Sequence, residues 1–164
     1  MDRAFIDESL PVLTFPPEAH DLQRLADAGF KSIVNLGQAG EQGEKLSPQA
    51  EADEARESGL EYLHYPISPP DLTAASAKDL AAQLERLPNP VAIHCASGRR
   101  ASLMGLVSWA QRTDWDAAKA AERGREAGLE ISEADLSPLI NAIGADENGG
   151  FAVVSGQADF RAKA

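Results

Sequence analysis

The chain has 164 residues, of which 43% are hydrophobic and 25% charged, a profile typical of one soluble globular domain. Its 15 lysines and arginines against 26 aspartates and glutamates give a formal net charge of -11, which argues against nucleic acid and anionic membranes as partners. A single cysteine excludes an internal disulfide. With no signal-peptide pattern and no apolar run of membrane-spanning length, these features predict a cytoplasmic protein.

The first half of the chain alternates helical and strand patterns. A short strand is predicted at residues 11–14, followed by a helix that opens at Pro16-Pro17-Glu18 and ends at Gly29. Further along the chain, the sequence predicts a buried strand at 32–36, a glycine-rich loop at 37–45, a helix from Ser47-Pro48 to Gly59, a strand at 61–67 and a turn at 68–71.

The second half continues this pattern. The sequence predicts a helix capped near Thr73 that runs to Leu87, an apolar strand from Val91, a buried helix at 101–109, an amphipathic helix at 115–126 and a last helix from Ser132 through Ile143. Residues 151–154 fit an edge strand or a tethered tail equally well. We therefore expect one domain over residues 1–145 and a tail of uncertain structure over 146–164.

Three strand patterns, each preceded by a helix, favour parallel strands with right-handed crossovers. The predicted fold class is α/β, with a central, mainly parallel sheet of about four to five strands flanked by helices. In such sheets the reactive crevice lies at the carboxyl ends of the strands. Cys95 occupies such an end, in a loop between a core strand and a buried helix.

The segment from His94 to Arg100 contains the candidate active-site residues. A thiol at the start of a helix lies beside unpaired N–H groups and the positive end of the helix dipole, which favours the thiolate. The small residues Ala96, Ser97 and Gly98 allow their amides to converge on an anion. Arg100 can direct two N–H donors onto an oxyanion, and Arg99 is either a surface charge or a second guanidinium at the pocket mouth.

Two further side chains have predicted supporting roles. His94 precedes the cysteine, so its side chain should point to the opposite face of the strand and hold the loop by a hydrogen bond to nearby backbone. Asp71 follows a strand parallel to that of Cys95 and is the candidate general acid, although a turn or cap role fits it equally well. Glu41 and Glu44 are the alternatives on the loop 37–45.

The residues His94-Cys95-Ala96-Ser97-Gly98-Arg99-Arg100 resemble the phosphate-binding loop of the cysteine-dependent tyrosine and dual-specificity phosphatase superfamily. They look most like a compact bacterial phosphatase-like branch, to which 28–36, 58–62 and 124–129 are also similar. The resemblance implies a phosphomonoester hydrolase in which Cys95 forms a phosphocysteine, Arg100 clamps phosphate and Asp71 is the acid. It implies a phosphorylated protein or small phosphoester as substrate. No His, Cys and Asp residues have metal-ligand spacing, so we expect no metal and no cofactor.

Two departures from the superfamily pattern leave other functions open. Four residues separate Cys95 from Arg100 where the common loop has five, a length shared with rhodanese-like sulfurtransferases. The hydroxyl residue that usually follows the arginine is Ala101 here, with Ser102 one place later. A sulfurtransferase using a cysteine persulfide and a phosphate-binding pseudophosphatase are therefore the alternatives. The oligomeric state is not predicted.

Overall fold

A computed structural model describes residues 3–7 and 10–149. In this part of the chain five strands form one sheet, in the order β1-β2-β5-β3-β4. The strands β2, β5, β3 and β4 run parallel, and β1 pairs antiparallel with β2 at one edge. Their bounds are Arg3–Asp7 (β1), Leu10–Leu13 (β2), Ser32–Asn35 (β3), Glu61–His64 (β4) and Val91–His94 (β5). The predicted mainly parallel sheet is confirmed; β1, which has only three apolar residues between two charged ones, was not predicted.

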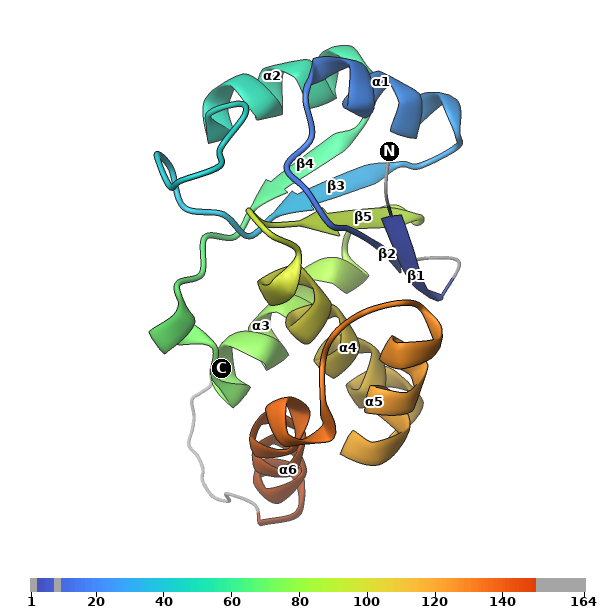
Figure 1. Cartoon of the computed structure of the whole chain (residues 1–164), viewed down its shortest axis with the longest axis vertical. Coiled ribbons are helices and arrows are strands. Elements are labelled where there is room, and N and C mark those ends of the chain that lie inside the picture. Colours follow the sequence, from blue (N-terminus) through green and yellow to red (C-terminus); the bar gives the residue numbers. More distant parts are fainter. Residues whose placement is uncertain (1–2, 8–9, 150–164) are drawn as a thin grey trace.

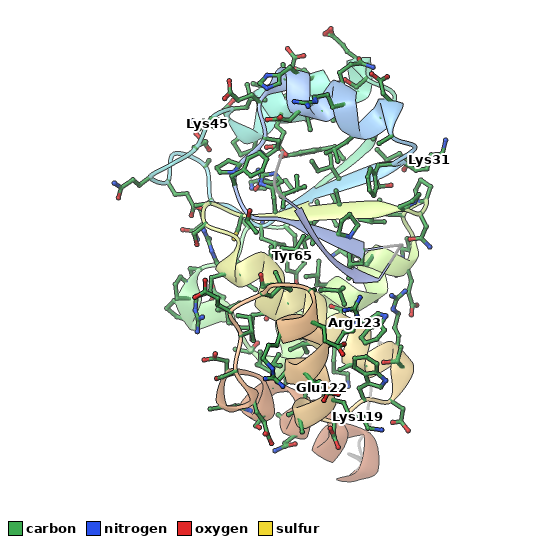
Figure 2. All side chains as sticks on the ribbon, turned by 45° about the vertical axis from the view of Figure 1, so that its right-hand side comes forward. Lys31, Lys45, Tyr65, Lys119, Glu122 and Arg123 are labelled. Atoms are coloured by element: carbon green, nitrogen blue, oxygen red, sulfur yellow. The ribbon has the colours of Figure 1, made fainter. Side chains whose placement is uncertain are left out.

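Helices cover both faces of this sheet. The helices α1 and α2 lie on one face, and α3 to α6 lie on the other (Figure 1). Their bounds are Ala19–Asp27 (α1), Pro48–Glu57 (α2), Ala74–Glu85 (α3), Arg99–Thr113 (α4), Ala117–Glu126 (α5) and Glu133–Gly149 (α6), with a 3-10 turn, η1, at Pro69–Asp71. In Figure 2 the labelled side chains of Lys119, Glu122 and Arg123 show where α5 lies. The predicted α/β class is confirmed.

Local chemistry explains where several of these elements begin and end. Ser47 caps α2 by accepting the Ala50 N–H at 3.2 Å, and Thr73 caps α3 by accepting the Ser76 N–H at 3.2 Å. The strand β4 ends at His64, shortly before Pro66, which has no N–H for the ladder. The helix α6 extends to Gly149, and the segment 151–154 lies outside the described residues.

The alternation of side chains across the sheet separates two cores. Ile33 and Ala92 pack with α1 and α2, whereas the next residues, Val34 and Ile93, pack on the opposite side. Cys95 belongs to the core on the α4 side. The side chain of the intervening His94 points toward α2, so the prediction that His94 and Cys95 face opposite sides is confirmed.

The carboxyl ends of β3, β4 and β5 lie at one edge of the sheet, and the loops that follow them emerge there together (Figure 1). The strand register aligns Asn35 with His94 on one side and with His64 on the other, so these three residues form one polar row across the edge. None of the described helices is long and apolar enough to cross a membrane.

Candidate active site

The Cys95 thiol lies at the junction of β5 and α4 and is 1% exposed. The Gly98 N–H donates to its Sγ at 3.2 Å. Because α4 begins at Arg99, the first N–H groups of this helix have no acceptor within it and remain available to an anion. Gly98 has a φ of 91°, and a Cβ there would lie 2.9 Å from the Cα of Thr14. Glycine thus allows the chain to turn tightly beneath the sulfur.

Three hydrogen bonds to oxygens of the described residues hold the end of the Arg100 guanidinium. Its Nη1 and Nη2 donate to the two carboxylate oxygens of Glu41 at 3.1 and 2.5 Å, and Nη1 also donates to the Ile67 carbonyl at 2.9 Å. Since a guanidinium has five N–H donors, the Nε–H and the second Nη2 hydrogen meet no oxygen acceptor in the part of the chain that the structure describes, and these two form a bidentate edge. Arg100 lies within hydrogen-bonding reach of the Cys95 sulfur.

The Glu41–Arg100 pair is ionised. Burial opposes the charge on Glu41, but the hydrogen bond from Arg100 and a backbone hydrogen bond at Gln38 outweigh it and hold the pKa of Glu41 below its ordinary value. The same pairing raises the pKa of Arg100 further. A carboxyl group that stays ionised is suited to fixing an arginine and is poorly suited to donating a proton.

The space beside Cys95, which we call the Cys95 hollow, is small in this conformation. Its volume of about 20 Å³ accommodates one water. The loop 37–45 forms one wall with Glu41, Glu44 and Lys45, and Lys45 marks the end of this loop next to α2 in Figure 2. The other polar lining residues include Asn35, Glu51 and His94.

The other residues of the cysteine loop line two different hollows. Ala96 lines the Cys95 hollow, whereas Ser97, Gly98 and Arg99 line another, larger hollow on α4, of about 350 Å³. The Arg99 guanidinium donates to Asp135 of α6 at 3.0 Å and is largely exposed. Arg99 is thus a largely exposed charge paired with α6, and its role as a second guanidinium at the pocket mouth stays a prediction.

Asp71 lies in η1, on the loop that follows β4. Its carboxylate accepts the Ser68 hydroxyl at 2.6 Å and is exposed, and it is not among the described residues that line the Cys95 hollow. Ile67, on the same loop, contacts Arg100. Asp71 therefore shares a loop with a residue that touches the arginine, and its role as the acid stays a prediction.

His94 has a partner that the sequence did not indicate. Its Nε2 lies 2.6 Å from Oε2 of Glu51 on α2, and both side chains are buried. The predicted hydrogen bond to loop backbone is wrong, because the ring extends across the sheet face to α2. The loop is supported instead by Ser102, whose hydroxyl donates to the Gly98 carbonyl at 2.6 Å.

Sequence reasoning missed Glu51, as well as the pairing of Glu41 with Arg100. The helix α2 contains several other acidic residues, so the sequence does not set Glu51 apart. In the structure, Glu51 and Ala55, which lies one helical turn later, are the buried residues of α2. No group of three or more His, Cys, Asp or Glu in the described part of the chain is placed to hold a metal ion.

Comparison with known proteins links this arrangement to phosphatase-like domains. The family model described as "Beta-lactamase hydrolase-like protein, phosphatase-like domain" matches residues 2–112. Beta-lactamase hydrolase-like proteins of Agrobacterium fabrum and Xylella fastidiosa are 32% and 29% identical over 96 and 92 residues, which are 58% and 56% of this chain. The matched parts are only 22% and 21% of those relatives, so the likeness covers about a fifth of their length.

Solved structures share the fold. The active form of Tk-PTP has a TM-score of 0.67 at 22% identity, covering 86% of this chain and 95% of that one. P. aeruginosa TpbA, in complex with pTyr, has a TM-score of 0.62 at 20% identity, covering 87% and 83%. PTPMT1 in complex with PI(5)P has a TM-score of 0.65 at 16% identity, covering 88% and 96%.

Proposed function

Because the chain belongs to the family of phosphatase-like domains of beta-lactamase hydrolase-like proteins, we propose that it is a cysteine-dependent phosphomonoester hydrolase. The observation that carries the proposal is the junction of β5 and α4, where the Cys95 sulfur, the Gly98 N–H and the bidentate edge of Arg100 meet. A sulfur nucleophile beside a bidentate cation and unpaired helix N–H groups has the parts required for phosphoryl transfer.

The reaction proceeds in two displacements. The Cys95 thiolate attacks phosphorus in line, an S–P bond forms, and the P–O bond to the leaving group breaks. Arg100 and the loop amides stabilise the equatorial oxygens, while protonated Asp71 gives its proton to the leaving oxygen. Water then attacks the phosphocysteine with Asp71 as base, the S–P bond breaks, and inorganic phosphate leaves with the thiolate restored.

The Cys95 hollow is too small for a phosphate group in this conformation, and we propose that the loop 37–45 moves outward when substrate binds. Asp71 must likewise release Ser68 and turn toward the leaving group. We propose a phosphorylated protein or a small phosphoester in the cytoplasm as substrate, in keeping with the pTyr and PI(5)P bound by TpbA and PTPMT1.

The decisive experiment is hydrolysis of p-nitrophenyl phosphate by the wild type and by Cys95→Ser, Arg100→Ala and Asp71→Asn variants. We expect no turnover with Cys95→Ser and a loss of roughly 10²–10³ in kcat with Arg100→Ala. Asp71→Asn should remove the fall in kcat at high pH, because that limb reports loss of the acid's proton. Equal rates in wild type and Cys95→Ser would overturn the proposal.

The same preparation discriminates the alternatives by mass spectrometry. A phosphatase gains phosphate on Cys95 when quenched during turnover. A sulfurtransferase instead gains one sulfur on Cys95 after treatment with thiosulfate, and a pseudophosphatase binds inorganic phosphate with neither modification nor turnover. Either of the last two results would overturn the proposed hydrolase.

A further inference from the structure

A buried polar cluster lies behind the cysteine loop, on the α2 side of the sheet. Glu51 and His94 are each 2% exposed, and Asn35 is 5% exposed. Besides the contact between Glu51 and His94 at 2.6 Å, the Asn35 amide donates to Glu51 at 3.4 Å and to the Tyr62 hydroxyl at 3.1 Å. The mechanism above uses none of these four side chains directly.

Glu51 is buried at a cost that its partners must offset. Removing a carboxylate from water costs several kcal/mol unless hydrogen bonds and opposite charge replace the water. The exposed acids Asp53 and Glu57 on the same helix incur no such cost. Glu51 lies one turn inside α2, on the side of Ala55, so the helix packing directs its carboxylate to the carboxyl edge of the sheet.

His94 depends on Glu51 for its orientation. An ionised carboxylate only accepts hydrogen bonds, so the contact at 2.6 Å requires the proton on Nε2 of His94. The other ring nitrogen, Nδ1, is buried without a hydrogen-bond partner in the described structure. The bond to Glu51 is therefore the hydrogen bond that fixes the imidazole directly before Cys95.

The same cluster fixes the loop that carries Glu41. The Asn35 side-chain oxygen accepts the Gly37 N–H at 2.7 Å, and Nε2 of His64 donates to the Gly37 carbonyl at 2.7 Å. A Cβ on Gly37 would lie 3.1 Å from Oε1 of Glu41, so this carboxylate passes close over the anchored peptide on its way to Arg100. Glu51 thus contacts, through His94 and Asn35, both sides of the active site.

We propose that Glu51 is a positioning residue that orients His94 behind the nucleophile and, through Asn35, the loop that holds Arg100. The proposal rests on the proposed function only for its effect on turnover. The titratable groups around the cluster are Tyr62 and His64 on β4, Glu41, Glu44 and Lys45 on the loop 37–45, and Cys95. Burial, followed by the charge of Glu51, raises the pKa of Tyr62, so its phenol stays neutral.

The test measures alkylation of Cys95 by iodoacetamide against pH in wild type, Glu51→Gln and Glu57→Gln. The two variants lose the same charge from the same helix, but Glu57 is exposed. In Glu51→Gln the hydrogen bond that orients His94 loses its charged acceptor and weakens, so we expect the pH midpoint of Cys95 alkylation to differ from that of wild type. The kcat of Glu51→Gln should fall about tenfold with little change in KM, while Glu57→Gln matches wild type. An unchanged midpoint and kcat in folded Glu51→Gln would overturn the proposal.

A second measurement needs neither a variant that folds nor a phosphatase substrate. In wild type labelled with ¹⁵N-histidine, NMR should show His94 as the Nε2–H tautomer at neutral pH, with a slowly exchanging ring proton. A freely exchanging His94 ring would overturn the proposal. If the alkylation and NMR results hold while p-nitrophenyl phosphate is not hydrolysed, the proposed function fails and the positioning role stands.

Discussion

At the residue scale, the two neighbouring arginines of the loop differ in their exposure and in the carboxylates with which they pair. Arg99 is 59% exposed and pairs with a carboxylate on α6. Arg100 is 14% exposed and pairs with Glu41, whose two oxygens engage the end of the guanidinium. Exposed ion pairs contribute little, whereas a charged hydrogen bond in a partly buried site contributes about 1.5–3 kcal/mol.

Glu41→Gln tests whether this carboxylate orients Arg100 for substrate. Losing the charged bidentate contact should reduce kcat/KM for p-nitrophenyl phosphate by roughly 10- to 100-fold, the equivalent of the hydrogen-bond energy above. Glu44→Gln is the matched control, since Glu44 lines the same hollow but accepts from the Gly40 backbone N–H. An increase in kcat/KM for Glu41→Gln would instead mean that Glu41 competes with phosphate for Arg100.

The lowered pKa of Glu41 predicts how its contribution to stability depends on pH. Because the folded-state pKa lies below the ordinary value of 4.5, the pair stabilises the fold fully above that value, and the contribution is lost as pH falls through the folded-state pKa. Urea unfolding from about pH 6 to about pH 3 should show the wild type more stable than Glu41→Gln at the upper end, with this difference becoming smaller toward the lower end. A difference independent of pH would contradict this.

At the element scale, the sequence predicts what depends on neighbours in the chain. The alternation around His94 and Cys95, the caps at Ser47 and Thr73, and the glycine-rich loop are all local patterns, and the structure has each of them. The pairings that complete the site join residues far apart: His94 and Glu51 are separated by 43 positions, and Arg100 and Glu41 by 59. Only the packing of α2 and of the loop 37–45 over the sheet edge brings them together.

Gly98→Ala tests the tight turn between β5 and α4. A φ of 91° strains an alanine by about 1–3 kcal/mol, and the contact of 2.9 Å with the Thr14 backbone adds to this. We expect lower stability in urea unfolding and a changed rate of Cys95 alkylation, because the Gly98 N–H donates to Sγ. Gly59→Ala is the control: its φ is 87° but a Cβ there meets nothing within 4 Å, so it should be less destabilising and leave alkylation unchanged.

At the scale of the whole molecule, the active site draws on both helical layers. The α2 layer supplies Glu51, and α4 on the other face supplies Arg100, so the reactive loop lies where the two layers meet the carboxyl edge of the sheet (Figure 1). The family match ends at residue 112, inside α4, and α6 beyond it supplies the Asp135 partner of Arg99. Both loop arginines are thus neutralised by carboxylates within a chain of formal net charge -11.

This charge balance predicts that the molecule repels anionic reagents from Cys95 until salt screens its field. The test compares alkylation of Cys95 by iodoacetate, an anion, with alkylation by iodoacetamide, its neutral analogue of similar size. Raising the ionic strength from about 0.01 to about 0.15 M shortens the screening length from about 30 to about 8 Å. The rate ratio of iodoacetate to iodoacetamide should then rise several-fold, because only the anion feels the net negative charge. A ratio that falls with salt would mean that the bidentate edge of Arg100 and the α4 N-terminus dominate the local field, and that the site attracts anions despite the charge of the whole chain.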